Sequence, residues 1–329
     1  MDMPETPLMT SSEIGTLWIT YQQKTMLFQM LDYFINQSDD HEAKEIMSSL
    51  KEDIQPFIAQ MVSMFNAEGI PIPIGFVPQD VNKDAPKLYD NGFDIMFVRL
   101  IKEISSGMHT LNLTMVYRED IILFFRNLTK MTQKYYDDCT KYLLKKGLLP
   151  RAPYVTIDKS IEFVKSNNYL DGAKLFSEKR PLNTVEIAHI YHGIESNVTG
   201  MQMILGFAQV AKEKEAKKYF HKGGELAKSI IKDMGEVLLQ NNIQVPTTAG
   251  GNITDSKVPP FSDKIMMYCI SLFCSFSLGG NSVGTAFSLR NDIPLKFATY
   301  MKDIFEYAHE GAKIMIQNGW MEEPPQTIK

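Results

Sequence analysis

The sequence predicts an all-α protein built from two tandem four-helix bundles. Three observations support this class: apolar residues recur every three or four positions over long segments, the chain repeats itself, and each half contains one long proline-rich connection. The three-four spacing is the pattern of an amphipathic helix. With 329 residues, the chain is long enough to form two domains, each with its own core.

The internal repeat appears when the chain is aligned with itself. At an offset of 173 residues, the triplet EAK at 42–44 matches EAK at 215–217, and Glu13 matches Glu186. After a deletion of one residue in the second repeat, the offset becomes 172, and RED at 118–120 matches RND at 290–292. We therefore expect a first bundle at 1–150, a linker with short helical segments at 151–182, and a second bundle at 183–329.

Each repeat is predicted to contain four helices. In the first repeat, the third helix should run from near Leu88 to Tyr117, and the fourth should begin at RED and run to Gly147. In the second repeat, helices are expected near 184–211, 213–241, 261–288 and 292–318. The first-to-second and third-to-fourth connections are only a few residues long, so each of these pairs should form an antiparallel hairpin.

The middle connection of each repeat is longer and rich in proline, as in GIPIPIGFVPQDVNKDAP at 69–86. About 18 extended residues can span up to about 60 Å, whereas a helix of about 27 residues is roughly 40 Å long. The connection can therefore run the full length of the bundle and make helices two and three parallel. A four-helix bundle with one long crossover has the ferritin-like arrangement.

Composition excludes some classes of function. The 34 basic and 39 acidic residues give a net charge of −5, which argues against a surface that binds nucleic acid. The three cysteines, Cys139, Cys269 and Cys274, form no CxxC pair, so we expect buried free thiols in a reducing cytoplasm. The first residues show no basic stretch followed by an apolar one, so no signal peptide is expected.

One apolar segment, residues 265–289, carries no charge and is long enough to span a bilayer. Serines, Asn281 and the pair Gly279–Gly280 interrupt its hydrophobic character. A central helix that is surrounded by other helices fits this pattern better. We therefore expect no membrane span.

Two Glu-x-x-His motifs, EIAH at 186–189 and EYAH at 306–309, raise the question of a metal site. This spacing on helices is the ligand signature of di-iron bundles. In the predicted topology, however, the two motifs lie about 20–30 Å apart by helix rise, and Glu306 and His309 fall opposite the apolar stripe of their helix. We therefore expect no metal ligands, no catalytic residues and no cofactor.

The polar residues that recur in both repeats are predicted to be structural. TSSE at 10–13 and NTVE at 183–186 read as capping boxes, which place Glu13 and Glu186 at the start of the first helix of each repeat. The aspartates that end RED and RND are expected to cap the fourth helices. We expect the guanidinium groups of Arg118 and Arg290 to bind Glu13 and Glu186, respectively.

Several motifs carry a resemblance to a known family. They are GIPIPIGFVPQDVN, VPPFSDKIMMY, KRPLNTVEI and IMIQNGWMEEPPQ. Together they resemble an uncharacterised family of Bacillus-type spore formers, whose members contain two copies of a ferritin-like domain of unknown function. Some members are provisionally described as spore coat proteins, by similarity to the single-domain coat protein F. The resemblance implies fold and lineage, and it brings no catalytic residues with it.

These observations favour a non-enzymatic structural or interaction protein, located in the cytoplasm or the spore coat. Its expected partners are other proteins, such as spore coat components, and its oligomeric state is left open. Two alternatives stay open as well. One is a metal-binding or oxidase-like protein of the ferritin superfamily, and the other is a carrier of a small apolar ligand in a bundle core.

Overall fold

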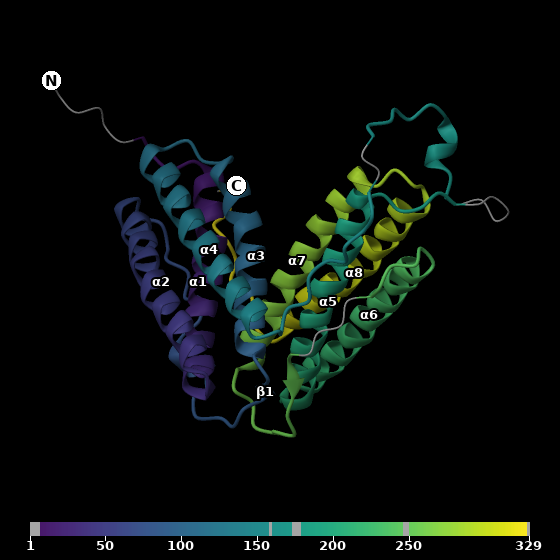
Figure 1. Cartoon of the computed structure of the whole chain (residues 1–329). Coiled ribbons are helices and arrows are strands. Elements are labelled where there is room, and N and C mark those ends of the chain that lie inside the picture. Colours follow the sequence, from purple (N-terminus) through teal and green to yellow (C-terminus); the bar gives the residue numbers. More distant parts are fainter. Residues whose placement is uncertain (1–6, 158–159, 173–178, 246–249, 328–329) are drawn as a thin grey trace.

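The computed structural model describes residues 7–157, 160–172, 179–245 and 250–327, and over these ranges it contains eight long helices in two bundles (Figure 1). The first bundle consists of α1 (Ser11–Gln37), α2 (His41–Ala67), α3 (Phe93–Leu113) and α4 (Glu119–Lys145). The second consists of α5 (Thr184–Val210), α6 (Lys214–Leu239), α7 (Asp263–Phe287) and α8 (Asp292–Gln317). The predicted all-α class with two tandem four-helix bundles is confirmed.

The remaining elements are short. Two 3₁₀ helices, η1 (Pro78–Asp80) and η2 (Asn167–Leu170), lie in the first crossover and in the linker between the bundles. Two strands, β1 (Tyr89–Asp90) and β2 (Asn252–Ile253), lie in the two crossovers. Each crossover therefore contributes one strand.

Local sequence explains where several helices begin and end. Thr10 and Asn183 close capping boxes at the starts of α1 and α5, as predicted. Ser262 caps α7 by accepting a hydrogen bond of 3.2 Å from the backbone N–H of Ile265. Gly147 and Gly319 follow α4 and α8 with φ of 68° and 65°, a left-handed conformation that ends a helix and favours glycine.

Contacts at one end of each bundle establish the helix directions. Glu68, the C-cap of α2, forms an ion pair with Arg118, the N-cap of α4, so α2 ends beside the α3–α4 turn. Because α3 also ends at this turn, α2 and α3 run parallel. In the second bundle, Asn241, just after α6, accepts a hydrogen bond of 3.1 Å from Arg290 at the α7–α8 turn. Both bundles therefore have the predicted long crossover between parallel second and third helices.

The third helix of the first repeat begins later than predicted, at Phe93 instead of near Leu88. Tyr89 and Asp90 are held in β1 by pairing with the other repeat. Asn91 and Gly92 then take positive φ values of 57° and 77°, which are incompatible with a right-handed helix. Pairing with a segment that is distant in sequence thus outweighs local helix propensity here.

The two crossovers pair with each other in an antiparallel sense. The residues that pair are Tyr89 with Ile253, Asp90 with Asn252, and Val81 with Phe261. Backbone hydrogen bonds from Thr254 to Leu88 (3.0 Å) and from Asn82 to Pro260 (2.8 Å) extend the same register. The paired crossovers connect the two bundles at the closed end of a V, as Figure 1 shows near the label β1.

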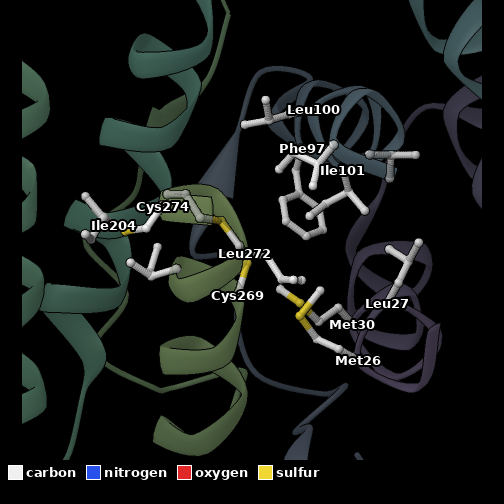
Figure 2. Close-up of a cluster of buried hydrophobic side chains, with 14 of the residues drawn as sticks. Met26, Leu27, Met30, Phe97, Leu100, Ile101, Ile204, Cys269, Leu272 and Cys274 are labelled. Carbon is white, nitrogen blue, oxygen red and sulfur yellow. The ribbon is translucent and has the colours of Figure 1, made fainter. Parts of the chain in front are cut away.

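A continuous hydrophobic core joins the bundles near this end. Figure 2 shows Leu272 of α7 directed toward Met26 and Met30 of α1, while Cys274 of the same helix is directed toward Ile204 of α5. By length and composition, α7 is the one described helix that could cross a membrane. It packs against α3, α5 and α8.

Ion pairs between α3 and α5 also cross the junction. Arg99 on α3 donates a hydrogen bond of 2.5 Å to Glu195 on α5, and its remaining N–H groups bind two hydroxyl groups of α4. Next to it, Nε2 of His192 lies 2.5 Å from a carboxylate oxygen of Glu103. The side chains of Arg99, Glu103 and Glu195 are mostly buried, whereas that of His192 is 45% exposed. The buried pair of Arg99 and Glu195 therefore holds α3 against α5 more strongly than an exposed pair would.

Candidate functional site

The two Glu-x-x-His motifs do not come together. Glu186 is buried at the start of α5, where it contacts the α7–α8 turn. Glu306 is 14 residues along α8 from Asp292 at the start of that helix, which is about 20 Å by helix rise. Glu306 and His309 are both exposed, and Glu306 pairs with Lys302 at 3.4 Å. The two motifs therefore do not share a metal ion, as the topology predicts.

No group of three or more histidine, cysteine, aspartate or glutamate side chains lies close enough to hold a metal ion in the described parts of the chain. The expected lack of metal ligands, catalytic residues and cofactor remains a prediction. Elemental analysis of protein purified without a chelating tag would test the metal part of it.

In the first bundle, Glu13 connects the start of α1 to the α3–α4 turn. Its carboxylate oxygen Oε1 accepts hydrogen bonds from the backbone N–H groups of Tyr117 (2.9 Å) and Arg118 (2.7 Å). Its other oxygen accepts one from the N–H of Thr10 (2.7 Å) and closes the capping box. Only 1% of Glu13 is exposed, so the carboxylate is a buried link between two backbone segments.

Glu186 has the corresponding role in the second bundle. Its Oε1 accepts hydrogen bonds from the backbone N–H groups of Leu289 (3.2 Å) and Arg290 (2.9 Å) at the α7–α8 turn. Arg180 in the linker adds two charged hydrogen bonds to this carboxylate, of 2.7 and 2.9 Å. We refer to Glu13 and Glu186, with the backbone amides that they bind, as the two carboxylate latches.

The prediction that these carboxylates lie beside Arg118 and Arg290 is confirmed, but the predicted atoms are wrong. The backbone N–H groups of the arginines bind the carboxylates, because these oxygens already sit among amide donors at the turn. The guanidinium of Arg118 instead binds Asp120 at 2.8 and 3.0 Å, and that of Arg290 binds Asp292 at 2.8 and 3.2 Å. The aspartates are therefore not N-caps as predicted; Arg118 and Asn291 occupy those positions.

The hydrogen bonds of the first latch also change the acidity of its carboxyl group. Burial by itself would raise the pKa of Glu13, but the backbone amides of Thr10, Tyr117 and Arg118 favour the charged form more strongly and lower the pKa to about 2. In the second latch, hydrogen bonds from Arg180 and from backbone amides likewise outweigh burial, and the pKa of Glu186 is lowered. Both carboxylates are therefore charged at neutral pH.

A second polar group, which the sequence reasoning missed, lies in the middle of the first bundle. Lys24, Lys102, Ser105, His109 and Thr132 are all completely buried, and they come from α1, α3 and α4. Lys24 and Thr132 are the central residues of two 27-residue helices, and Lys102 lies beside the centre of α3. We call these five residues the basic cluster.

Hydrogen bonding within the basic cluster is incomplete. Nζ of Lys24 donates to the side-chain oxygen of Gln23 at 3.4 Å, and Nδ1 of His109 lies 3.2 Å from the hydroxyl of Thr132. Nζ of Lys102, Oγ of Ser105 and Nε2 of His109 have no hydrogen-bond partner within the described protein. Buried polar groups in this condition are rare in folded proteins and call for a specific explanation.

Burial and mutual repulsion shift the acidity of the three basic groups. Burial lowers the pKa of Lys102 to about 7. It also lowers the pKa of Lys24, with a further contribution from the nearby charge of Lys102. The pKa of His109 is lowered by burial and then by both lysines. Groups shifted in this way are candidates for functional sites.

A pattern in the sequence could have identified part of this cluster. Lys102, Ser105 and His109 are spaced by three and four residues, so they lie on one face of α3. The same face bears Val98 and Ile101, which are buried in the core. Polar residues in register with an apolar stripe point into a bundle, and this signal was available before the structure.

A pocket lies where α3 of the first bundle meets the second bundle, and it continues into the second bundle. A cavity of about 90 Å³ lies between α3, α5 and α7, next to one of about 80 Å³ that shares Asn197, Gly200, Phe273 and Ser277 with it. Glycines on the facing helices leave the space, and phenylalanine rings form much of the lining. The pocket is therefore predominantly apolar, with a few polar groups at its wall.

The fold and the interior of the bundles define an all-α protein of two fused four-helix bundles. More specifically, the chain belongs to the family described as "Protein of unknown function (DUF3231)", whose model matches it twice, over residues 2–161 and 170–329. No curated protein matches the chain.

One solved structure is similar to part of the chain. It is a protein assigned provisionally to the spore coat of Bacillus halodurans C-125. It is 17% identical, and the match covers 46% of this chain and 98% of that one, with a TM-score of 0.44.

We predict that Glu13→Gln destabilises the protein and removes part of its acid sensitivity. The carboxylate latch stabilises the fold fully above the ordinary glutamate pKa of 4.5, and this stabilisation is lost as the pH falls toward about 2. At neutral pH, we expect a loss of about 3 kcal/mol in the free energy of unfolding, measured by urea denaturation. Glu306→Gln on the exposed face of α8 is the control, and equal stability of the two variants would contradict the prediction.

We predict that Lys102→Met changes the pH dependence of stability in the alkaline range. The pKa of Lys102 is about 7 in the folded protein and 10.5 in an unfolded chain, so the unfolded state binds more protons between these values. Wild-type stability should therefore rise relative to the variant from about pH 7 to about pH 10.5, by up to about 1.4 kcal/mol per pH unit. Urea denaturation at several pH values measures this, with exposed Lys302→Met as a control; parallel wild-type and variant curves would refute it.

Proposed function

We propose that the protein acts by binding other proteins, as a non-enzymatic structural or interaction protein, and that it associates with the spore coat. The observation that carries the proposal is an apolar stripe on the outer face of α8. The paired crossovers and the shared core hold the two bundles together. In this arrangement the outer face of α8 is exposed, on the side opposite its buried face.

The α8 stripe contains Leu295, Ala298, Phe305, Ala312 and Ile316, with Lys302 and His309 between them. Leu295, Phe305 and Ile316 are 60%, 62% and 63% exposed. The positions follow a strict three-four alternation, which is the spacing that packs one helix against another. The opposite face of α8 is already buried in the bundle core, so α8 is apolar on two sides.

The spacing favours a helical partner. An amphipathic helix binds through residues three or four positions apart, and the α8 stripe offers matching positions over three turns or more. Lys302 and His309 within the stripe, and Glu306 beside it, would favour one orientation of the partner through charge. The binding partner is therefore expected to be a protein with an exposed amphipathic helix.

Association with the spore coat rests on the sequence motifs. GIPIPIGFVPQDVN, VPPFSDKIMMY and the other shared motifs resemble a family of spore formers, some members of which are provisionally described as coat proteins. An extended protein with an exposed binding helix suits a role in a layered assembly. This part of the proposal can be tested separately from the α8 stripe.

We predict that Phe305→Asp removes the protein from the coat of sporulating cells. A charge at the centre of the α8 stripe should cost about 2 kcal/mol of binding free energy, or roughly a thirty-fold loss of affinity. Quantitative blotting of coat extracts and soluble fractions measures the distribution, and circular dichroism verifies folding.

The matched control is Gln317→Asp, which adds the same charge at the exposed end of α8. Wild-type protein confined to the soluble fraction would refute coat association. Wild-type protein in the coat, with Phe305→Asp distributed in the same way, would refute the role of the α8 stripe.

The pocket between α3 and the second bundle supports a second candidate function, a carrier of a small apolar ligand. Gly193, Gly200 and Gly280 open the space between α5 and α7, and Phe273 and Phe276 line it. At about 90 Å³, the cavity is smaller than typical ligand sites of about 300–1,000 Å³. A ligand of more than a few atoms would therefore require movement of the phenylalanine rings.

The carrier function predicts that purified protein contains a bound apolar molecule. Solvent extraction followed by mass spectrometry should detect it, and Gly200→Leu, which fills the pocket, should reduce the amount about tenfold or more. The control is Gly15→Leu, at a helix position with open space around it. Equal extracts from wild type and Gly200→Leu would exclude this function.

A further inference from the structure

We propose that the interior of the first bundle binds a small monovalent inorganic anion, held by Lys24, Lys102 and His109. The proposal concerns a different part of the molecule from the α8 stripe and does not depend on it. It follows from the position of these side chains, the kind of atoms they present and the lack of any other charge to balance them.

The position is where bundle proteins place their bound groups. Lys24, Lys102 and Thr132 lie at or beside the midpoints of α1, α3 and α4, and all three side chains are fully buried. Side chains from facing helices at this depth form the metal and cofactor sites of four-helix bundles. Here the facing side chains are basic and not acidic, so the site suits an anion instead of a metal cation.

The atoms presented are mainly hydrogen-bond donors. A lysine ammonium has three donors and no acceptor, and a serine or threonine hydroxyl can donate one. Nζ of Lys102, Oγ of Ser105 and Nε2 of His109 all lack a partner among the described residues, and Ser105 lies one turn from each of the other two. These groups are donors of the kind from which a small anion accepts hydrogen bonds.

Nothing in the described protein supplies the opposite charge. Among the described residues, Glu13 and Glu186 are the only fully buried carboxylates, and both are bound in the carboxylate latches. The mostly buried carboxylates of Glu103 and Glu195 are paired with His192 and Arg99. The thiol of Cys139 on α4 is near Lys102, but burial raises its pKa to about 12, so it is neutral. A proton on either lysine therefore needs an anion from solution.

The second bundle lacks this charge at the matching positions. The offsets of 173 and 172 that align the repeats pair Lys24 with Asn197, Lys102 with Cys274, and His109 with Asn281. None of these counterparts carries a positive charge. The basic cluster is thus a property of the first repeat alone, and the second bundle serves as an internal control in the same molecule.

Binding should be coupled to protonation. The anion stabilises the charged form of the cluster, so it binds together with a proton taken up by a lysine. Because burial lowers the pKa of Lys102 to about 7, affinity should fall roughly tenfold per pH unit above that value. Cys139, Lys24 and His109 are the other titratable groups that interact with Lys102.

Bromide is a suitable probe because its anomalous scattering identifies it in a crystal. We expect one anomalous peak within hydrogen-bonding distance of Lys102 and His109 in full-length protein crystallised with sodium bromide at about pH 6. We expect none between Asn197, Cys274 and Asn281. Ordered water without anomalous signal at the basic cluster would overturn the proposal.

A measurement in solution separates specific binding from occupancy at crystal concentration. At about pH 6 and constant ionic strength, replacing gluconate with bromide should raise the urea midpoint of the wild type in a saturable way. The rise should vanish in Lys102→Met and in Lys24→Met, persist in exposed Lys302→Met, and shrink at about pH 9. A rise that is equal in all four proteins, or none in the wild type, would refute the proposal.

Discussion

Antiparallel pairing of the two crossovers is the constraint on which the rest of the structure depends. The backbone N–H and C=O groups of a buried crossover need hydrogen-bond partners. Pairing supplies them, as in the hydrogen bond from the N–H of Thr254 to the C=O of Leu88. The pairing also fixes where α3 and α7 begin, and these helices, with α5, meet at the junction. Leu272 of α7 faces the first bundle and Cys274 faces the second (Figure 2). The position of α7 at the junction therefore gives the two bundles a shared core.

The two ends of each bundle are held by different chemistry. At the closed end of the V, backbone pairing and apolar contacts join the repeats (Figure 1). At the open end, a carboxylate latch joins the first helix to the turn between the third and fourth. A buried carboxylate that binds several amides is strong because each hydrogen bond is charge-assisted. Between the two ends the interiors of the repeats differ, since Lys24, Lys102 and His109 correspond to Asn197, Cys274 and Asn281.

The topology could be predicted from the sequence, because helix periodicity, loop length and the internal repeat all show in local pattern or spacing. It also placed Glu13 and Glu186 beside the correct turns. The start of α3 was missed because it depends on pairing between Tyr89 and Ile253, which are far apart in the chain. The atoms that bind the carboxylates were missed because backbone amides are the same at every position. The basic cluster was missed because lysines are ordinarily read as solvent-facing, although the spacing of Lys102, Ser105 and His109 marked an inward face.

The register of the crossovers has a further consequence. Val81 pairs with Phe261, and Leu88 pairs with Thr254. In the alignment of the repeats, Val81 corresponds to Thr254 and Leu88 to Phe261, so these two contacts are equivalent by symmetry. This reciprocity is the signature of a symmetric homodimer, now made within one polypeptide. In a homodimer, both subunits have the same sequence, so every substitution changes both bundle interiors. Once the two subunits are fused into one chain, each repeat can change independently. One bundle interior can then become charged while the other stays neutral.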